Sequence, residues 1–531
     1  MGSGAAGLSA ALAASADGAR VLVLEKSPLV GGSTSLSGGC VWVPANHVMQ
    51  QVRVTDSPEE ALQYIRAVAP AGWQETEDAR WRAWVEQSPR MLEFVERHSP
   101  LRFRPTREPD PYAEAPGGKL RGRNVTPAPV RMSVLGEWQH KVRPPISDSR
   151  LGYDEIVDHH IFAAPRVRRR RFLPRVWWRR WRGLQVRGTA LVAGLLKGCL
   201  DHGVEVWTES SLESLSFEGG GFSGCEVTRR GASLALAARH VVLAAGGFEW
   251  NASMMGEHFP GPVEWTATPN TNSGDGHRLL REAGGELAHM DQALIMGTTP
   301  VNYEGAVHGQ PAVDYTMPHS MIVNRRGRRF VNEKQMNIGL AFAERDPTDG
   351  LPVNLPAWRI FDGEFARRYP HALPDATFPG NCFQADTLVE LARLIEVDAA
   401  GLVQAARRFS EFARRNCDED FGRGTSVWDR ERGGDPAHPV SNTLGAIETP
   451  PFFAMPFKAS FLGTKGGART NTDAQVLRPD GSVIPGLYAA GNVMANPIGS
   501  KGVGAGTTLG PCLTWGYIAG RHAARSVNLS R

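Results

Sequence analysis

Two glycine-rich loops near the beginning of the chain have the composition of loops that hold phosphate groups. The first is a GxGxxG turn formed by Gly2, Gly4 and Gly7, with an expected helix over residues 8–14 and an expected strand over residues 21–25. In such a turn the first glycine permits the bend, the second lets the backbone approach a pyrophosphate, and the third lets the helix pack on the sheet. Glu25 ends the strand, where a carboxylate can bind ribose hydroxyls. The unit predicts a dinucleotide site.

The second loop, residues 31–39, is rich in both glycine and hydroxyl side chains. It offers backbone N–H groups and hydroxyl donors to an anion or to the edge of a flavin, and the alternative interpretation is a flexible surface linker. Two strand-like segments, 203–206 and 241–247, bracket the same nucleotide site, and the second of them ends in glycines. We therefore expect both loops to converge on one ligand.

A dinucleotide-binding sheet has a strand directly before the first glycine, and here only Met1 precedes Gly2. We expect that the sequence is a truncated reading of a longer chain, with the initiator inside the glycine loop. A version extended upstream by one strand is then expected to be more stable and to retain its dinucleotide better.

The composition excludes several classes of protein. The 531 residues are 41% hydrophobic and 21% charged, and no apolar run approaches the roughly 18 residues that cross a bilayer. Six scattered cysteines without a CxxC pair argue against a disulfide scaffold and against a zinc site. We expect a globular, cytoplasmic protein of two to four domains or one composite fold, with no metal site.

Basic residues are concentrated in one segment. Residues 166–187 contain ten arginines and no acidic residue, so the remainder of a chain of net charge +4 sums to −6. Within 166–182 the arginines are interleaved with Trp177, Trp178 and Trp181, a composition that suits peripheral contact with an anionic membrane. The alternatives are that this segment binds an acidic group of the substrate, such as a coenzyme A phosphate, or that it is a solvated loop. Nucleic acid is not expected as a partner, because the rest of the chain is acidic.

Further glycine-rich motifs return late in the chain and carry a family resemblance. They lie in residues 463–467, 486–492 and 504–510, and the segments 272–276 and 329–333 carry the same resemblance. Together these motifs resemble FAD-dependent dehydrogenases of the fumarate reductase and succinate dehydrogenase flavoprotein superfamily, and within it the 3-ketosteroid Δ1-dehydrogenases. The likeness covers nearly the whole chain.

The resemblance implies an α/β fold, with a Rossmann-like FAD-binding domain built from both chain ends and an inserted α+β cap domain that closes over a hydrophobic cleft. We place the first part of the FAD-binding domain at residues 1–290, with the arginine- and tryptophan-rich insertion at about 160–187, the cap or substrate domain at 291–455, and the return segment at 456–531. Within the cap, the sequence predicts a hairpin over 321–331 and helical periodicity over 388–415.

The resemblance also implies the cofactor, FAD, and the residues that bind it. These residues lie in the glycine loops and at strand ends: Gly2, Ser3, Gly4, Ala6, Gly7, Glu25, Lys26, Gly32, Ser33, Thr34, Ser37, Gly38, Gly39, Val206, Ala245, Gly246, Asp275, Gly491, Asn492, Gly506 and Leu509. FAD supplies the redox chemistry in such enzymes, while the protein positions the substrate and stabilises developing charge.

The activity that the resemblance implies is removal of a proton and a hydride from adjacent carbons next to a ketone. The substrate would be a hydrophobic cyclic ketone or a steroid-like molecule, and an external acceptor would take the electrons. A fumarate reductase-like enzyme acting on enoates or dicarboxylates is one alternative. A non-catalytic flavoprotein that has lost the family's base is another.

The catalytic tyrosines of that family fall on other residue types here. Alignment through residues 329–333 places Asn337 at the base, and alignment through the last glycine motif places Gly502 at the tyrosine that holds the ketone oxygen. Tyr112 lies one position from a third family tyrosine, so we expect it to contribute to proton abstraction. The backbone N–H of Gly506, aided by Lys501, is expected to bind the carbonyl oxygen. The other candidate groups are Tyr303, Tyr315, His308 and His319.

Overall fold

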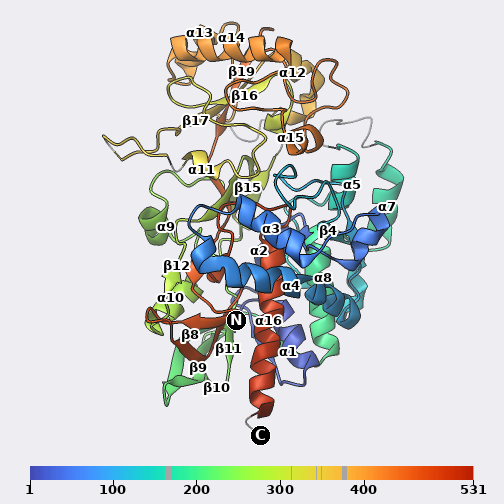
Figure 1. The fold of residues 1–531 in the computed structure, drawn as a ribbon, viewed down its shortest axis with the longest axis vertical. Helices are drawn as coiled ribbons and strands as arrows, with labels where there is room; N and C mark the ends of the chain where they lie inside the picture. Colours follow the sequence, from blue (N-terminus) through green and yellow to red (C-terminus); the bar gives the residue numbers. More distant parts are fainter. Residues whose placement is uncertain (162–169, 313, 343, 349, 374–379, 530–531) are drawn as a thin grey trace.

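The computed structural model describes residues 1–161, 170–312, 314–342, 344–348, 350–373 and 380–529. The molecule is elongated, and both ends of the chain lie in its lower half (Figure 1). The upper end is formed by elements from the second half of the sequence, including the helices labelled α13 and α14. Helices and strands occur together along the chain, so the expected mixed α/β fold is confirmed.

Short strands form the centre of the lower half. β1 (Leu22–Leu24) is parallel to β7 (Glu205–Trp207), and β11 (Val241–Leu243) is parallel to β23 (Val483–Ala489), which also pairs with antiparallel β22 (Gln475–Leu477). Met1 and Gly2 lie between the two parallel pairs. The amino group of Met1 donates to the Val242 carbonyl (2.9 Å), and the Gly2 N–H donates to the Leu24 carbonyl (2.7 Å). The first residues of the chain thus join the two pairs.

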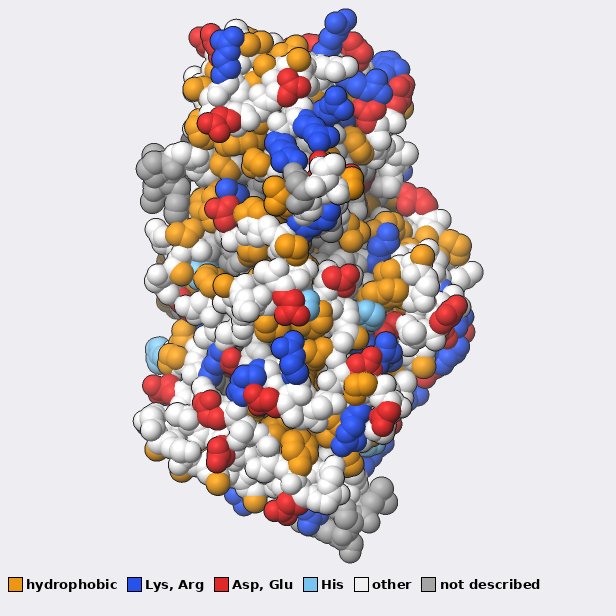
Figure 2. Space-filling model, turned by 90° about the vertical axis from the view of Figure 1, so that its left-hand side faces the viewer, with side chains coloured by type: hydrophobic (Ala, Val, Ile, Leu, Met, Phe, Trp, Pro, Cys, Tyr) orange, Lys and Arg blue, Asp and Glu red, His pale blue; other side chains and the backbone are white. Residues whose placement is uncertain are grey.

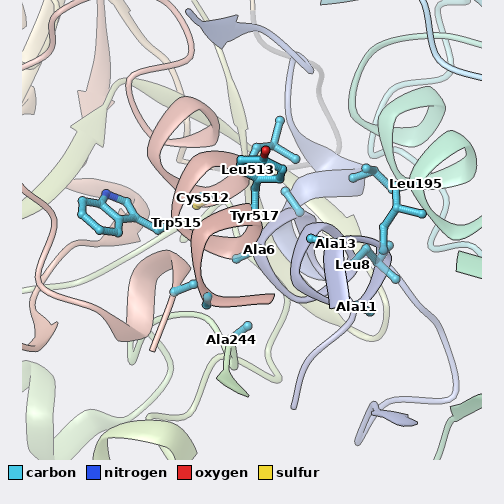
Figure 3. Close-up of a cluster of buried hydrophobic side chains, with 14 of the residues drawn as sticks. Ala6, Leu8, Ala11, Ala13, Leu195, Ala244, Cys512, Leu513, Trp515 and Tyr517 are labelled. Atoms are coloured by element: carbon cyan, nitrogen blue, oxygen red, sulfur yellow. The ribbon is translucent and has the colours of Figure 1, made fainter. Parts of the chain in front are cut away.

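Four long helices pack around these strands: α1 (Ala5–Ala16), α4 (Gln74–His98), α8 (Arg187–Asp201) and α16 (Leu509–Leu529). Helices α1 and α16 touch backbone to backbone, since a side chain on Gly516 would overlap the Ala6 carbonyl. Figure 3 shows Leu8 of α1 beside Leu195 of α8, with Leu513 of α16 in the same cluster. This close packing fixes the N-terminal glycine turn against the C-terminal helix.

The remaining elements of the lower half surround this centre. One antiparallel sheet contains β8 (Ser210–Glu218), β9 (Gly221–Arg229) and β10 (Ala232–Ala237). A second sheet contains β2 (Val41–Trp42), β4 (Asn124–Pro127) and β3 (Phe103–Pro105), and β5 (Val130–Arg131) pairs with β6 (Leu184–Gln185). The shorter helices are α2 (Gly32–Leu36), α3 (Pro58–Val68), α5 (Tyr153–Asp158), α7 (Leu173–Trp181), α9 (Ala252–His258) and α10 (Asp275–Glu282).

The upper half is built on one antiparallel sheet with the order β16 (Ser320–Val323), β17 (Ala357–Phe361), β19 (Phe452–Phe457) and β18 (Phe383–Ala385). Helices α13 (Leu388–Leu394) and α14 (Ala399–Arg415) supply the apolar residues that bury its face, including Leu402 and Phe409. The other helices here are α11 (Gly339–Phe342), α12 (Gly363–Arg368) and α15 (Val427–Glu431).

Two local predictions for this half need correction. The expected hairpin over 321–331 is wrong, because β16 pairs with β17 and the segment after it makes only a tight turn, closed by the Asn324 N–H on the Arg328 carbonyl (3.0 Å). The helical pattern over 388–415 is two helices. The second helix, α14, begins at Ala399. The carboxylate of Asp398 caps it by accepting from the N–H groups of Ala400 and Gly401 (3.1 and 3.2 Å).

Antiparallel strand pairs connect the two halves. β13 (Ala293–Met296) pairs with β20 (Ser460–Thr464), and β12 (Leu287–Ala288) pairs with β21 (Gly467–Ala468). A separate hairpin is formed by β14 (Thr298–Tyr303) and β15 (Ala306–Pro311). The chain therefore enters and leaves the upper half along neighbouring strands, so elements of both halves meet at this level.

The face shown in Figure 2, which is the left-hand side of Figure 1, carries basic and acidic side chains interspersed with apolar ones. Helix α7 lies at the opposite edge of the molecule (Figure 1).

None of the helices in the described ranges combines the length and the hydropathy needed to cross a membrane.

Candidate active site

The glycine turn at the N-terminus forms one wall of a long cleft. Gly2 has a φ of +95°, and a side chain there would overlap the Ala244 carbonyl. A side chain on Gly7 would overlap the Gly2 carbonyl, so this glycine holds the helix against the turn. Gly4 differs from both. Its φ and ψ of −73° and −176° suit any residue, and the nearest protein atom to a Cβ there is Thr34 Oγ1 at 3.5 Å. The protein therefore leaves room at Gly4, at the start of α1, where a phosphate would sit.

Side chains of the two predicted loops tie the cleft together. The hydroxyl of Ser3 donates to Glu25 Oε2 (2.6 Å), and the Gly31 N–H donates to the same hydroxyl (2.9 Å). The Ala5 N–H donates to Thr34 Oγ1 (3.0 Å). The carboxylate of Glu25 thus holds the glycine turn as well as lining the cleft.

The far wall of the cleft comes from residues 271–275. Lys26 Nζ forms an ion pair with Asp275 Oδ2 (2.5 Å) and donates to Ser273 Oγ (2.6 Å). The Asn272 side-chain amide donates to Ser33 Oγ (3.0 Å). Residues from the end of the chain, 491–492 and 505–509, complete the lining. Backbone N–H groups, hydroxyls and one helix N-terminus are the donors that a dinucleotide needs, so the residues present fit FAD.

All but two of the predicted cofactor residues line this cleft. Gly7 and Val206 do not belong to its lining. Gly7 packs α1 on the turn, and Val206 lies in β7 beside Val23 of β1, behind the cleft. Lining residues that the sequence did not single out include Ser210 and Thr271.

A second cavity of about 590 Å³ opens from the end of the cofactor cleft. It lies within the roughly 300 to 1,000 Å³ of small-molecule sites. The two spaces share lining residues from both halves of the molecule: Ser33, Ser37, Gly38, Tyr153, Met296, Met336, Arg432 and Leu462. A ligand in the second cavity and a cofactor in the cleft would therefore be neighbours at these residues.

Three polar side chains from distant segments meet at this junction. Tyr153, the first residue of α5, donates its hydroxyl to the Glu108 carboxylate at 3.0 and 3.1 Å. Arg432, which follows α15, forms an ion pair from Nε to Glu108 Oε1 at 2.9 Å. Its Nη1 also lies 3.3 Å from Met336 Sδ. The junction thus carries a linked phenol, carboxylate and guanidinium.

Burial shapes the acid–base properties of this cluster. It raises the pKa of Tyr153 well above its ordinary value and raises the pKa of Glu108 as well, although the Arg432 cation opposes the shift of Glu108. The ring of Tyr153 packs on Gly38, where a Cβ would lie 2.9 Å from the ring. A buried carboxylate of raised pKa that accepts from a tyrosine is a better proton acceptor than an ordinary glutamate.

The predicted catalytic residues lie in several places. The ring of Tyr112 packs against an apolar cluster of α3 and α4 residues, and Lys501 Nζ lies 5.0 Å above it. Neither lines the cleft or the second cavity. Asn337 is buried, donates to the carbonyls of Ala293 (2.9 Å) and Ser500 (2.7 Å), and so joins β13 to the loop before α16. Gly506 lines the cofactor cleft.

Among the other candidates, Tyr315 lines the second cavity, and burial raises its pKa to about 12. Tyr303 donates its hydroxyl to the Pro144 carbonyl (2.7 Å), and His319 Nδ1 contacts the Ala446 carbonyl (2.6 Å). His308 is buried in β15. The structure therefore brings only Tyr315 and Gly506 of the predicted catalytic groups to the two spaces.

The sequence contained a partial signal for the missed cluster. The pair Pro109 and Asp110 lies in the correct loop, but the residue of this loop that is linked to the junction is Glu108, through its bonds to Tyr153 and Arg432. Tyr112 lines neither space. Asp110 has a structural role, because it accepts from Trp42 Nε1 and Arg123 Nη1, both at 2.9 Å. It fixes the loop that carries Glu108. No motif marks Tyr153 or Arg432.

A cleft with the donors that FAD needs, beside a cavity that shares a linked phenol, carboxylate and guanidinium with it, is the arrangement expected of a flavoprotein oxidoreductase. A family model described as "FAD binding domain" matches residues 1–509. The chain is 36% identical to the 3-oxosteroid 1-dehydrogenase of Mycobacterium tuberculosis, over 99% of this chain and 97% of the relative. It is 34% identical to the 4-oxocyclohexanecarboxylate 2-dehydrogenase of Sinomonas cyclohexanicum, over 99% and 92%.

A solved structure is similar over the same length. The 3-ketosteroid Δ1-dehydrogenase of Sterolibacterium denitrificans, in complex with 1,4-androstadiene-3,17-dione, superposes with a TM-score of 0.90 at 34% identity and covers 99% of this chain and 98% of its own. The chain belongs to the FAD binding domain family, within the fumarate reductase and succinate dehydrogenase flavoprotein superfamily. It is an FAD-dependent oxidoreductase.

Proposed function

We propose that this protein is a dehydrogenase that removes a proton and a hydride from adjacent carbons next to a ketone, in a hydrophobic cyclic or 3-ketosteroid-like substrate. The observation that carries the proposal is the cluster of Tyr153, Glu108 and Arg432 at the junction of the cofactor cleft and the second cavity. The relatives act on ketones of two sizes, steroids and a cyclohexane ring.

The residues of the cluster have separate tasks in this reaction. A proton next to the substrate carbonyl passes to Tyr153 Oη while the hydroxyl proton of Tyr153 passes to Glu108, so the carboxylate is the final acceptor. Arg432 keeps Glu108 ionised before the transfer. The backbone N–H of Gly506 holds the carbonyl oxygen as negative charge develops there. When bound in the cleft, FAD would supply the hydride acceptor, and an external acceptor would take up the two electrons.

Anaerobic mixing of the purified holoenzyme with a panel of compounds tests this function. The panel contains 4-androstene-3,17-dione, 4-oxocyclohexanecarboxylate, neutral cyclic ketones and, as the comparison, succinate. Loss of flavin absorbance with a ketone, together with formation of the conjugated enone, supports the proposal. A flavin that stays oxidised with every ketone would contradict the proposal and leave the reductase and the non-catalytic flavoprotein as the alternatives.

The raised pKa of Glu108 gives this enzyme an expected pH dependence. Glu108 must be ionised to accept the proton, and burial raises its pKa above the ordinary value of 4.5. The rate of flavin reduction should therefore fall as the pH decreases through a pKa above that of an ordinary glutamate. Stopped-flow measurements from about pH 5 to 9 give the profile. An unchanged acid limb in Glu108→Gln would assign it to another group.

Arg432 also favours a second candidate, reduction of an enone or enoate. A guanidinium at the flavin junction, backed by the Glu108 carboxylate at 2.9 Å, can deliver a proton to carbon in the reverse direction. Reoxidation of the photoreduced enzyme by fumarate, an enoate and a cyclic dienone distinguishes these cases. Rapid reoxidation by fumarate combined with no reduction by ketones would favour the reductase.

Membrane contact through residues 166–182 is the other part of the proposal. Residues 166–169 lie outside the described ranges, whereas α7 is described. It exposes 70% of Trp177 and 69% of Trp181, with Arg180 and Arg182 also exposed. On its inner side, Phe172, Leu173 and Val176 line the second cavity. Interfacial tryptophans and cations beside a cavity for an apolar ketone suit an anionic lipid surface.

Arg179 shows that the basic segment is not solvated throughout. It is buried, and its guanidinium binds the Glu155 carboxylate of α5 at 2.5 and 2.9 Å. This ion pair anchors α7 on α5, the helix that also carries Tyr153. The exposed arginines are therefore the ones to replace in a test of lipid binding.

The variant Arg180→Ser with Arg182→Ser should bind vesicles of anionic phosphatidylglycerol roughly 30-fold less tightly than the wild type, since each cation near such a surface adds about 1 kcal/mol. Co-sedimentation measures the binding. The matched control is Arg407→Ser with Arg415→Ser, which removes two exposed arginines of α14. This control should bind as the wild type does. Equal binding by both variants would leave the solvated-loop interpretation in place.

A further inference from the structure

Lys334 is a buried lysine of the second cavity that the proposed reaction does not use. Only 4% of its surface is exposed, and it belongs to the lining of the cavity. Its backbone is fixed, because the Lys334 N–H donates to Asn332 Oδ1 (2.9 Å) and the Lys334 carbonyl accepts from Trp428 Nε1 (2.8 Å). The side chain is thus held in one region of the wall.

The ammonium group of Lys334 faces space that other cavity residues border. Its Nζ lies 3.3 Å from the position of a Cβ on Gly434 and 3.8 Å from that on Gly433, and both glycines line the cavity. A side chain on either glycine would crowd this position. The two glycines therefore keep the space around the ammonium open.

Among the residues that the structure describes, Lys334 Nζ has no hydrogen-bond partner. The neighbouring carboxylate, Glu333, is already bound by Arg329 (2.8 Å) and Arg423 (3.2 Å). The carboxylate of Asp429 accepts instead from Asn332 and from the Gly424 N–H, at 2.8 and 3.0 Å. Both nearby acids are thus committed to other partners.

An unpaired buried amine is costly, and such groups call for a physical explanation. Burial lowers the pKa of Lys334 to about 7, and the cations Arg423 and Arg432 add to this effect. A bound anion would reverse the effect by stabilising the charged form. The cavity wall therefore contains a buried amine without a hydrogen-bond partner, whose charged form a bound anion would stabilise.

We infer that Lys334 binds a carboxylate carried by the substrate, so that the cavity selects cyclic keto acids over neutral ketones of the same ring. The inference rests on the proposed function and names its substrate class. An ammonium and a carboxylate form a charge-assisted hydrogen bond, which is among the stronger polar contacts in proteins. Met336, two residues further, lines the flavin junction, so the two Cα atoms are at most about 7 Å apart. Lys334 Nζ also borders Gly433 and Gly434, which directly follow Arg432 of the junction, so a carboxylate bound there suits a compact keto acid.

A matched pair of substrates tests the inference. The apparent dissociation constants of 4-oxocyclohexanecarboxylate and its methyl ester are obtained from the concentration dependence of flavin reduction. The wild type should prefer the acid by roughly 10- to 100-fold, as expected for a hydrogen bond to a charged group. Lys334→Met should reduce this ratio to about one, and Lys334→Arg should retain part of it. An unchanged ratio in Lys334→Met overturns the inference.

A binding measurement separates this inference from the reaction itself. Cyclohexanecarboxylate has no ketone, so it reports the anion subsite by perturbing the flavin spectrum or by calorimetry even if no ketone is oxidised. Lys334→Met and Lys334→Gln should both weaken its binding at least 10-fold. Lys141→Met, an exposed lysine outside the cavity, is the control. Wild-type affinity in two folded, FAD-loaded Lys334 variants would exclude the subsite.

Discussion

Replacing Tyr153 with phenylalanine is expected to slow flavin reduction by roughly 10²- to 10⁴-fold, the usual contribution of a general acid–base group. The change removes one hydroxyl, which donates to Glu108 at 3.0 and 3.1 Å, and keeps the ring that packs on Gly38. FAD content and thermal stability should therefore change little. Stopped-flow bleaching with a substrate from the panel gives the rate, and the flavin spectrum gives the cofactor content.

Two other tyrosines make this experiment specific. Tyr112→Phe tests the expectation drawn from the sequence, and Tyr315→Phe removes a second hydroxyl that lies on the cavity wall. We expect the rate of Tyr112→Phe to stay within a few-fold of the wild type, since its ring packs outside both spaces. A wild-type rate in Tyr153→Phe, together with a large loss in Tyr112→Phe, would move the base to Tyr112.

Local geometry explains why the cofactor site could be predicted from the sequence. Gly2 and Gly7 are each required by a close backbone contact within a few residues, and a pattern of this kind is visible in a single segment. Glu25 belongs to the same unit, although its carboxylate binds Ser3 as well as lining the cleft. Val206 was predicted wrongly as a lining residue, because its position in a strand does not tell whether its side chain faces the cofactor cleft.

The acid–base cluster could not be predicted in this way. Glu108, Tyr153 and Arg432 come from three segments that only tertiary packing brings together, and Arg432 comes from the upper half of the molecule. Alignment to the family's tyrosines gave Asn337, whose side chain instead joins two backbone segments. Alignment alone therefore did not locate the acid–base groups, which had to be found from burial and hydrogen bonding.

Replacing Gly4 with valine is expected to abolish FAD binding and to leave the fold intact. The backbone at Gly4 suits a side chain, and no protein atom lies closer than 3.5 Å to its Cβ position. The added side chain would instead occupy the cleft at the N-terminus of α1, where the phosphates of a dinucleotide bind. The purified variant should be colourless, with a far-ultraviolet circular dichroism spectrum like that of the wild-type apoprotein.

A second glycine distinguishes loss of the cofactor from damage to the protein. Gly256 in α9 is exposed, and no atom lies within 4 Å of its Cβ position, so Gly256→Val should fold and retain FAD. Gly7→Val should fail differently, because its side chain would overlap the Gly2 carbonyl and separate α1 from the turn. We therefore expect aggregation or a large fall in melting temperature for Gly7→Val, and neither for Gly4→Val. A yellow Gly4→Val protein with normal flavin content would show that the phosphates do not pass this glycine, and the position of the cofactor along the cleft would have to be reassigned.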